Sequence, residues 1–307
     1  MAEWQAKTDL PTTCFIDWLG VGRSKYYDWV QRQGQANRHN GQLSKHNWLT
    51  EVEKEGIVAY QQSHRGTGYR RMSYMMLDED VVAASPSSVY RVLKEADLLH
   101  KAAVGSSKKG QGFQQPVAAH AHWHIDISYI NISSTFYYLC SILDGYSRFI
   151  VHWELQPAMT EADVELVLQR ARERFPQARP RIISDNGPQF IARDFKQFIR
   201  LCGMHHVRTS PYYPQSNGKI ERWHQTLKQE CIRPGTPLTL TDACRLVTTF
   251  VDHYNNHRLH SAIGYIAPAD KLAGREEIIF AQRRKKLTNA RQQRQLFWQE
   301  QTAVSAH

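Results

Sequence analysis

The stretch WHIDISYI, residues 123–130, decides the fold of the largest recognisable region of this chain. Apolar and polar residues alternate along it, which is the two-residue period of a β-strand with one buried face. Asp126 therefore lies on the polar face of a predicted strand, together with His124 and Ser128. The apolar face carries Trp123, Ile125, Ile127 and Tyr129.

Further strands and helices follow this first strand. The predicted strands cover residues 123–129, 136–143, 149–155, 181–184 and 204–208. Three helices are predicted. The first follows Thr160, the second contains Phe195 and Leu201, and the third begins at Ser216 or Asn217. The order βββ-α-β-α-β-α predicts an α/β region built on a mixed sheet flanked by helices.

The chain before this region is predicted to be all-α. Residues 8–32 suggest two short helices around a Gly-Val-Gly turn, with Arg23 and Lys25 at the start of the second helix. This pattern suits a DNA-reading helix-turn-helix, and an ordinary helical hairpin fits it equally well. Residues 48–98 are again helical, and Arg70 and Arg71 there are candidates for phosphate contacts or for a solvated face.

Composition shifts divide the chain into five predicted regions. Residues 101–120 are rich in Gly, Ser, Lys and Ala without periodicity, which is typical of a linker. The regions are 1–47 (helix-turn-helix-like and linker), 48–100 (second helical DNA-binding region), 101–120 (linker), 121–232 (α/β core) and 233–307 (C-terminal helical basic region).

Charge and cysteine content narrow the class of protein. The formal net charge is +10, and the excess is concentrated near the C-terminus, notably in the Arg-Arg-Lys-Lys run at 283–286. Such an excess favours a nucleic-acid partner. The five cysteines form no CxxC pair, so neither a disulfide framework nor a cysteine zinc site is expected. The sequence has no signal-peptide pattern and no apolar run of about 18 residues, so we expect a cytoplasmic protein, at the nucleoid when bound to DNA.

Three acidic residues stand at element ends of the α/β region. Asp126 lies in the first strand, Asp185 follows a later strand, and Glu221 lies one turn into the last helix. Phosphodiester chemistry needs two cations about 4 Å apart, held by a few carboxylates and the substrate phosphate. Clustered carboxylates repel one another, so without metal the site should be partly disordered or have raised pKa values. Each Asp alone is ordinarily a structural residue, and Asp185 also fits a simple turn with Asn186 and Gly187.

The surroundings of the three acids carry a family resemblance. The segments WHIDISYI, LDGYSRFIVHWEL, IISDNGPQF, SPYYPQSNGKIERWHQTLKQE and HYNNHRLHSAIGYIAPAD together resemble the catalytic core of DDE transposases and retroviral integrases. In particular, they resemble the second-frame product (OrfB) of the insertion-sequence-three family. The likeness covers roughly residues 120–272, and the upstream GYRRMSYMML and SPSSVYRVLKEADLL resemble the helix-turn-helix region of such transposases.

This resemblance implies an RNase H-like core that uses two Mg²⁺ or Mn²⁺ ions with Asp126, Asp185 and Glu221 as ligands. It also implies a multimer that brings both DNA ends together, and a circular intermediate. The His₂Cys₂ zinc module of retroviral integrases has no counterpart in this sequence, so zinc binding is not expected.

DNA contacts are expected around the acids. Residues three and four positions from Glu221 share its helix face, which should look into the cleft while Ile220, Trp223 and Leu227 pack behind it. Lys219 is the foremost candidate for gripping terminal phosphates, and a solvated helix is the alternative. The remaining candidates are Asn217, His224, Arg222 and Lys228 on the helix, Tyr213 and Gln215 in the loop before it, and Asn186 and Gln189 after the second acid. His124 is expected either to contact the residues that bind the metal, without binding it itself, or to lie at the surface.

The preferred function is DNA transposition by 3′-end cleavage and strand transfer. Water hydrolyses the bond at the 3′ end of the element, and the freed 3′-OH then attacks a second DNA site in line. No Walker A motif is present, so ATP is not required. A hydrolytic nuclease of RNase H type and a non-catalytic DNA-binding regulator are the alternatives. Fusion to a first-frame protein is a further possibility that the sequence leaves open.

Overall fold

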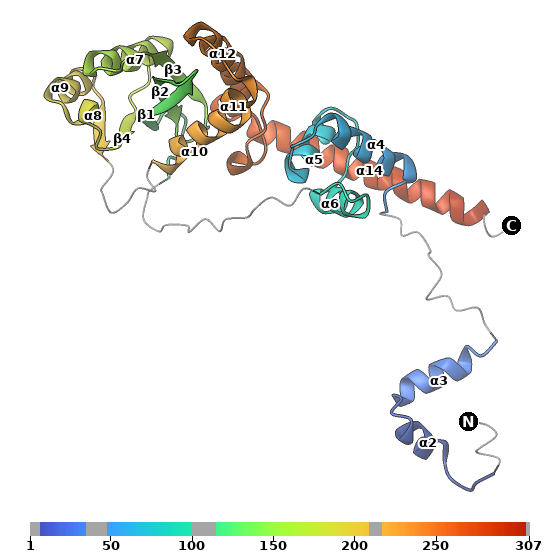
Figure 1. Ribbon diagram of the computed structural model, residues 1–307. Coiled ribbons are helices and arrows are strands. Elements are labelled where there is room, and N and C mark those ends of the chain that lie inside the picture. Colours follow the sequence, from blue (N-terminus) through green and yellow to red (C-terminus); the bar gives the residue numbers. More distant parts are fainter. Residues whose placement is uncertain (1–6, 35–47, 100–114, 209–216, 305–307) are drawn as a thin grey trace. The chain divides into compact units, whose positions relative to one another are not determined.

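The computed structural model describes residues 7–34, 48–99, 115–208 and 217–304 (Figure 1). The chain divides into two compact units, Met1–Trp48 with Gln295–His307 and Leu49–Arg294. Each unit is described by itself below. Among the described helices, none is both long enough and apolar enough to cross a membrane.

The first unit contains the predicted pair of short helices. Helix α2 covers Thr12–Trp18 and α3 covers Arg23–Gln31, separated by a turn in which Gly20 has a φ of 63°. Such a positive φ costs glycine little, which explains why this residue stands at the turn. Two separate helices are thereby confirmed, although a hairpin of this kind does not by itself define a DNA reader.

Three helices form a small bundle at the start of the second unit. They are α4 (Glu51–Ser63), α5 (Tyr69–Asp78) and α6 (Pro86–Glu95). Ser85 caps α6 by accepting the amide hydrogen of Ser88, and Pro86 occupies the first helical position, as predicted. Buried apolar side chains from all three helices, among them Ile57, Met76 and Leu93, hold the bundle together.

The α/β region is a five-stranded mixed sheet in the order β3-β2-β1-β4-β5. Strands β1, β2 and β3 are antiparallel, whereas β4 pairs parallel to β1 and β5 pairs parallel to β4. The strands are β1 (His122–Ile132), β2 (Thr135–Asp144), β3 (Ile150–Gln156), β4 (Arg181–Ser184) and β5 (His205–Arg208). This topology confirms the predicted RNase H-like core.

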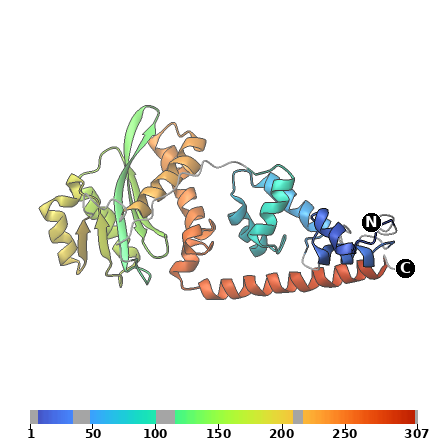
Figure 2. The same ribbon diagram turned by 90° about the horizontal axis from the view of Figure 1, so that it is seen from below.

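Helices cover both faces of the sheet (Figures 1 and 2). Helices α7 (Glu161–Arg174) and α9 (Arg193–Leu201) pack on one face, against Trp123 and Ile125 of β1. Helices α10 (Gly218–Leu227) and α12 (Leu240–Asn256) pack on the other face. The alternation along β1 therefore aims Asp126 at the α10 side of the sheet.

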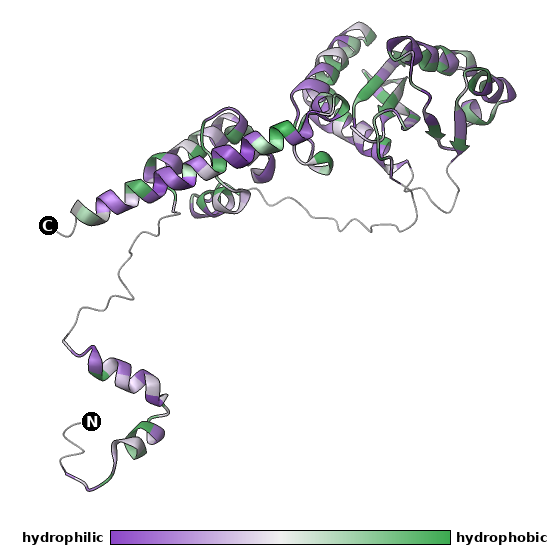
Figure 3. Cartoon of the chain, turned by 180° about the vertical axis from the view of Figure 1, so that it is seen from behind, coloured by the Kyte–Doolittle hydropathy of each residue, from purple (hydrophilic) through white to green (hydrophobic). Residues whose placement is uncertain are grey.

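Shorter elements connect these helices to the C-terminal part of the chain. They are α8 (Pro188–Ile191), the π-helix η2 (Lys228–Ile232), α11 (Arg233–Gly235), the 3₁₀-helix η3 (Ser261–Ile263), α13 (Pro268–Leu272) and α14 (Glu276–Val304). Helix α14 is largely hydrophilic along its length (Figure 3). Two of the four cations at 283–286 are engaged in ion pairs, Arg283 with Asp78 and Lys286 with Asp80.

Candidate active site

Asp126 lies on the polar face of β1, as the alternation predicts. Its Oδ1 accepts the amide hydrogen of Ile127 at 2.9 Å, and its Oδ2 lies 3.5 Å from Nδ1 of His224 on α10. Trp223 and Ile220 of α10 are buried against the sheet, which holds the helix at this distance. The contact between β1 and α10 therefore brings an acid of the strand next to the helix that carries Glu221.

Asp185 directly follows β4, the parallel neighbour of β1. Its Oδ1 accepts the amide hydrogen of Gly187 at 2.9 Å, which closes a tight turn before α8. A Cβ at residue 187 would lie only 3.1 Å from this oxygen, so glycine leaves room for the carboxylate. Because β4 runs parallel to β1, the turn after it lies beside the middle of β1, near Asp126.

Glu221 stands in the first turn of α10, on its exposed side. The opposite side of the helix, with Ile220, Trp223 and Leu227, is buried. This separation of faces is the one predicted from the spacing of the residues.

The three carboxylates act on one another electrostatically. Desolvation raises the pKa of Asp185, and the negative charge of Asp126 raises it further, against the lowering effect of the Gly187 amide. The pKa of Glu221 is likewise raised by desolvation and by Asp126 and Asp185, while His224 lowers it. Raised pKa values are what the sequence predicts for an uncompensated acidic cluster.

A surface pocket of about 350 Å³ opens beside two of these acids. Asp126 and Ser128 line it from β1, and the exposed face of α10 lines it from the other side. Residues of η2 and α11 also line the pocket, so that its lining contains basic as well as acidic side chains. The helical lining residues are Glu221, His224, Gln225, Lys228, Gln229 and Arg233.

The donor set fits a hard divalent cation. Carboxylate oxygens are the ligands that Mg²⁺ prefers, and a cation would relieve the repulsion that raises the two pKa values. Within the described ranges, however, no three His, Cys, Asp or Glu side chains are close enough to surround one ion. Oδ2 of Asp126 lies near His224, and Oδ1 of Asp185 accepts the amide hydrogen of Gly187.

A second group of polar residues lies next to the acids along β1 and α10. Nζ of Lys219 donates to the carbonyl oxygen of Gly145 at 2.9 Å. Burial and the charge of Arg148 lower the pKa of Lys219 to about 7, against a raising effect of Asp144. His124 is fully buried, and burial together with the charges of Lys219 and Arg148 lowers its pKa to about 3. Asn217 is also buried, and its side chain acts on His124 in the opposite direction, raising this pKa.

The other predicted DNA contacts have diverse surroundings. Arg222, Asn186, Arg23, Lys25 and Arg70 are exposed. Among the half-buried candidates, Lys228 lines the pocket, Gln189 donates to the carbonyl of Met159, and Arg71 has a pKa lowered by burial and by Arg258. Tyr213 and Gln215 lie outside the described residues.

Two basic residues near the site have no role in the sequence prediction. Arg148 occupies a turn with a φ of 68°, and Arg233 enters the pocket from α11. A third, Arg258, belongs to the segment 254–258, for which packing or local DNA contact is expected, and it pairs with Glu230 at 2.6 Å.

Two models of the integrase core domain match this chain, one over residues 116–214 and one over 202–268. Among related proteins, the transposase for insertion sequence element IS904 of Lactococcus lactis is 25% identical and covers 74% of this chain and 96% of its own length. Transposase InsD for insertion element IS2A/D/F/H/I/K of Escherichia coli is 28% identical, over 68% of this chain and 74% of its own length. An uncharacterized 39.2 kDa protein of insertion element IS476 from Xanthomonas euvesicatoria is 26% identical over 72% of this chain, which spans 64% of that relative.

Solved structures with a similar chain are viral integrases. A simian T-cell lymphotropic virus intasome in complex with PP2A regulatory subunit B56 gamma is 16% identical, covers 71% of this chain and 74% of its own, and has a TM-score of 0.47. The trimeric HTLV-2 integrase catalytic core in complex with magnesium is also 16% identical, covers 50% and 97%, and has a TM-score of 0.42.

The chain carries an integrase core domain and is similar to transposases of insertion elements, as its motifs predict. Members of this class cleave DNA and transfer strands. The predicted likeness to the insertion-sequence-three type is confirmed by the insertion-element relatives.

Proposed function

We propose that Asp126, Asp185 and Glu221 hold two divalent cations, Mg²⁺ or Mn²⁺, at the site of DNA cleavage. The observation that carries this proposal is the electrostatic coupling of three acids from β1, the end of β4 and α10. Cations bound there supply activation of the attacking oxygen and stabilisation of the leaving oxyanion. Asp126 acts electrostatically on both of the other acids, so it would be the central residue of the ligand set.

The residues of the pocket would hold the DNA strand during both reactions. Lys228 and Arg233 supply positive charge to the pocket, where the backbone of the strand needs neutralisation. Water attacks first to free a 3′-OH, and this 3′-OH then attacks target DNA at the same acids. The proposed DNA contacts are Lys219, Asn217, Gln215, Tyr213, Arg222, His224, Lys228, Asn186, Gln189, Arg23, Lys25, Arg70 and Arg71.

The substrates that follow are the terminal inverted repeats of an insertion sequence and a target DNA. We propose a homo-oligomer that pairs both ends, in the cytoplasm and at the nucleoid when bound. A first-frame protein is a proposed partner or fusion. The proposed working regions remain 1–47, 48–100, 101–120, 121–232 and 233–307.

A strand-transfer assay with labelled element ends tests the reaction. The wild type should yield joined products, and Glu221→Gln should abolish cleavage and joining while leaving end binding largely intact. Glu173→Gln, an exposed carboxylate of α7, is the matched control and should react like the wild type. Nicking without joining would support the nuclease alternative, and binding without either reaction would support a regulator. Joining by Glu221→Gln would overturn the assignment of the acids.

A further inference from the structure

Arg148 is a half-buried arginine whose donors are not used within the described protein. It lies in the turn between β2 and β3. Its Nε and Nη1 atoms are buried and have no hydrogen-bond partner among the described residues. Burying guanidinium donors without a partner costs folding free energy, and such groups ordinarily meet an anion.

A second cation reaches the same turn from α10. Lys219 donates to the carbonyl of Gly145, three residues before Arg148. The charge of Arg148 also acts on His260, whose pKa is lowered to about 3 by burial and by the charges of Arg148, Arg258 and Arg71. Positive charge is therefore concentrated around this turn from several elements.

Asp144 is the carboxylate that acts on both cations, and its oxygens are already engaged. Oδ1 accepts the amide hydrogen of His120 at 2.9 Å. Oδ2 accepts the amide hydrogen and the hydroxyl hydrogen of Ser147 at 2.7 and 2.6 Å. Asp144 thus shapes the turn, and it leaves Nε and Nη1 of Arg148 unpaired.

This cationic turn is adjacent to the acidic cluster. His124 precedes Asp126 by two residues on the same face of β1, a step of roughly 7 Å along a strand. Lys219 likewise precedes Glu221 by two residues on α10. A DNA strand carries a negative charge about every 3.4 Å along its helix axis, so neighbours of a phosphate held at the acids fall within reach of the turn.

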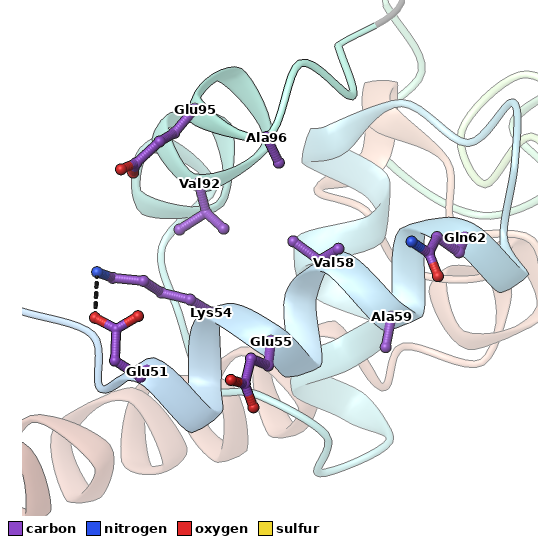
Figure 4. A pocket seen from close by; sticks show the side chains of 9 residues that line it. All are labelled: Glu51, Lys54, Glu55, Val58, Ala59, Gln62, Val92, Glu95 and Ala96. Carbon is purple, nitrogen blue, oxygen red and sulfur yellow. Dashed lines mark hydrogen bonds and ion pairs between the residues drawn. The ribbon is translucent and has the colours of Figure 1, made fainter.

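We propose that Arg148, together with Lys219, binds a DNA backbone phosphate next to the phosphate that is cut. The inference rests on the proposed function of the three acids. Guanidinium groups donate charge-assisted hydrogen bonds to phosphate oxygens, and Arg148 has donors without a partner among the described residues. A different pocket, between α4 and α6, is unsuited to phosphate because Glu51, Glu55 and Glu95 line it and Lys54 is paired with Glu51 (Figure 4).

Arg148→Gly tests the site with little risk to folding, because glycine favours a φ of 68°. Arg148→Asn is a second variant, since asparagine also tolerates this conformation. Ser134→Gly, at a φ of 66° in the turn between β1 and β2, is the matched backbone control. All are made in the Glu221→Gln background, so that binding of a labelled element end is measured without cleavage.

Both Arg148 variants should weaken binding about tenfold or more, as expected for a lost charge-assisted contact. They should also reduce the slope of log affinity against log salt by about 0.9, the effect of one phosphate contact. Ser134→Gly should change neither value. If the Arg148 variants keep the affinity and salt slope of the Ser134→Gly control, the phosphate site is wrong. This outcome is separate from a failure of the proposed function, which the joining assay on the wild type reveals.

Neutral methylphosphonate linkages, placed singly near the cleavage position, identify the phosphate. At one linkage, neutralising the phosphate should weaken DNA binding by the protein that keeps Arg148. The same change should not weaken binding by Arg148→Gly, because the side chain that contacts this phosphate is already removed. Losses that add at every linkage would contradict the proposal. Inorganic phosphate is the competing ligand: if it stabilises the wild type thermally but not Arg148→Gly while DNA affinities stay equal, the site binds free phosphate instead of DNA.

Discussion

Nδ1 of His224 lies 3.5 Å from Oδ2 of Asp126 and links α10 to β1 at the centre of the candidate site. The imidazole is only 5% exposed, and its Nε2 is buried without a hydrogen-bond partner in the described part of the chain. A buried ring at this position limits how the Asp126 carboxylate can rotate. His224 is therefore suited to orient a metal ligand, in addition to its predicted role in DNA contact.

Replacing His224 by Asn should raise the Mg²⁺ concentration needed for end cleavage, or lower the rate, by about 10- to 100-fold, the usual effect of losing a residue that orients a metal ligand. The measurement is the cleavage rate over a Mg²⁺ titration. His205→Asn, an exposed histidine on β5, is the control and should follow the wild-type curve. An unchanged titration for His224→Asn would rule out the orienting role.

The double variant Asp185→Asn/Glu221→Gln should be more stable than the wild type at pH 7 in metal-free buffer. Both carboxyls have raised pKa values in the folded state, so folding binds protons and stability falls as pH rises through those values. The difference should shrink as pH falls toward the ordinary pKa of Asp, 3.8. Thermal unfolding between pH 4 and about pH 7 measures it.

Mg²⁺ provides the matched test of the same carboxyls. It should raise the unfolding temperature of the wild type clearly more than that of the double variant, since only the wild type keeps all three carboxylates. Equal stability of the two proteins at pH 7 without metal would show that the acids do not repel one another.

Asn255→Ala should destabilise the second unit by about 2–4 kcal/mol, because two buried backbone groups lose their partners. Its Oδ1 accepts the amide hydrogen of Ile150 at 2.8 Å, and its Nδ2 donates to the carbonyl of the same residue at 3.0 Å. Its neighbour Asn256 is exposed, and its Nδ2 donates to Asp252 on the same helix. Asn256→Ala should thus stay within about 0.5 kcal/mol of the wild type in urea unfolding, and similar losses for both variants would contradict this account.

Arg283→Met should cost about 1–3 kcal/mol, whereas Arg284→Met should be nearly neutral. The Arg283 guanidinium donates to both oxygens of Asp78 and to the carbonyls of Gly264 and Tyr265, while Arg284 is exposed. Urea unfolding measures both variants. A loss of stability in Arg284→Met equal to that in Arg283→Met would point to general charge effects on α14.

Local patterns in the sequence carried much of the fold. Alternation predicted β1 with Asp126 on its polar face, and the short strand before Asp185 was predicted with the bounds it has, Arg181–Ser184. Helical spacing predicted that Glu221 stands opposite Ile220, Trp223 and Leu227. These features depend on the spacing of apolar residues along strands and helices and on the residues that cap helices, and both can be seen in a single sequence.

Other parts of the site depend on tertiary packing. Helical spacing put His224 near Glu221, but only the seating of α10 on β1 buries the ring beside Asp126. A non-glycine residue at positive φ is uncommon, so the conformation of Arg148 had no clear signal. The ion pair of Arg258 with Glu230 joins residues 28 positions apart, beyond the reach of local pattern.

The π-helix η2 changes which residue of the chain meets the pocket beside Asp126 and Glu221. In a continuous α-helix, residues 225, 228, 229 and 232 would share one stripe, which would bring Ile232 into the pocket. The wider i→i+5 turn over Lys228–Ile232 delays the stripe by one residue. Ile232 therefore stays in the apolar core and Arg233 takes the solvent-facing place. The single widened turn thus rotates the following residues by one position around the helix axis. As a result, Arg233 is added to the basic residues that line the pocket, and Ile232 stays buried.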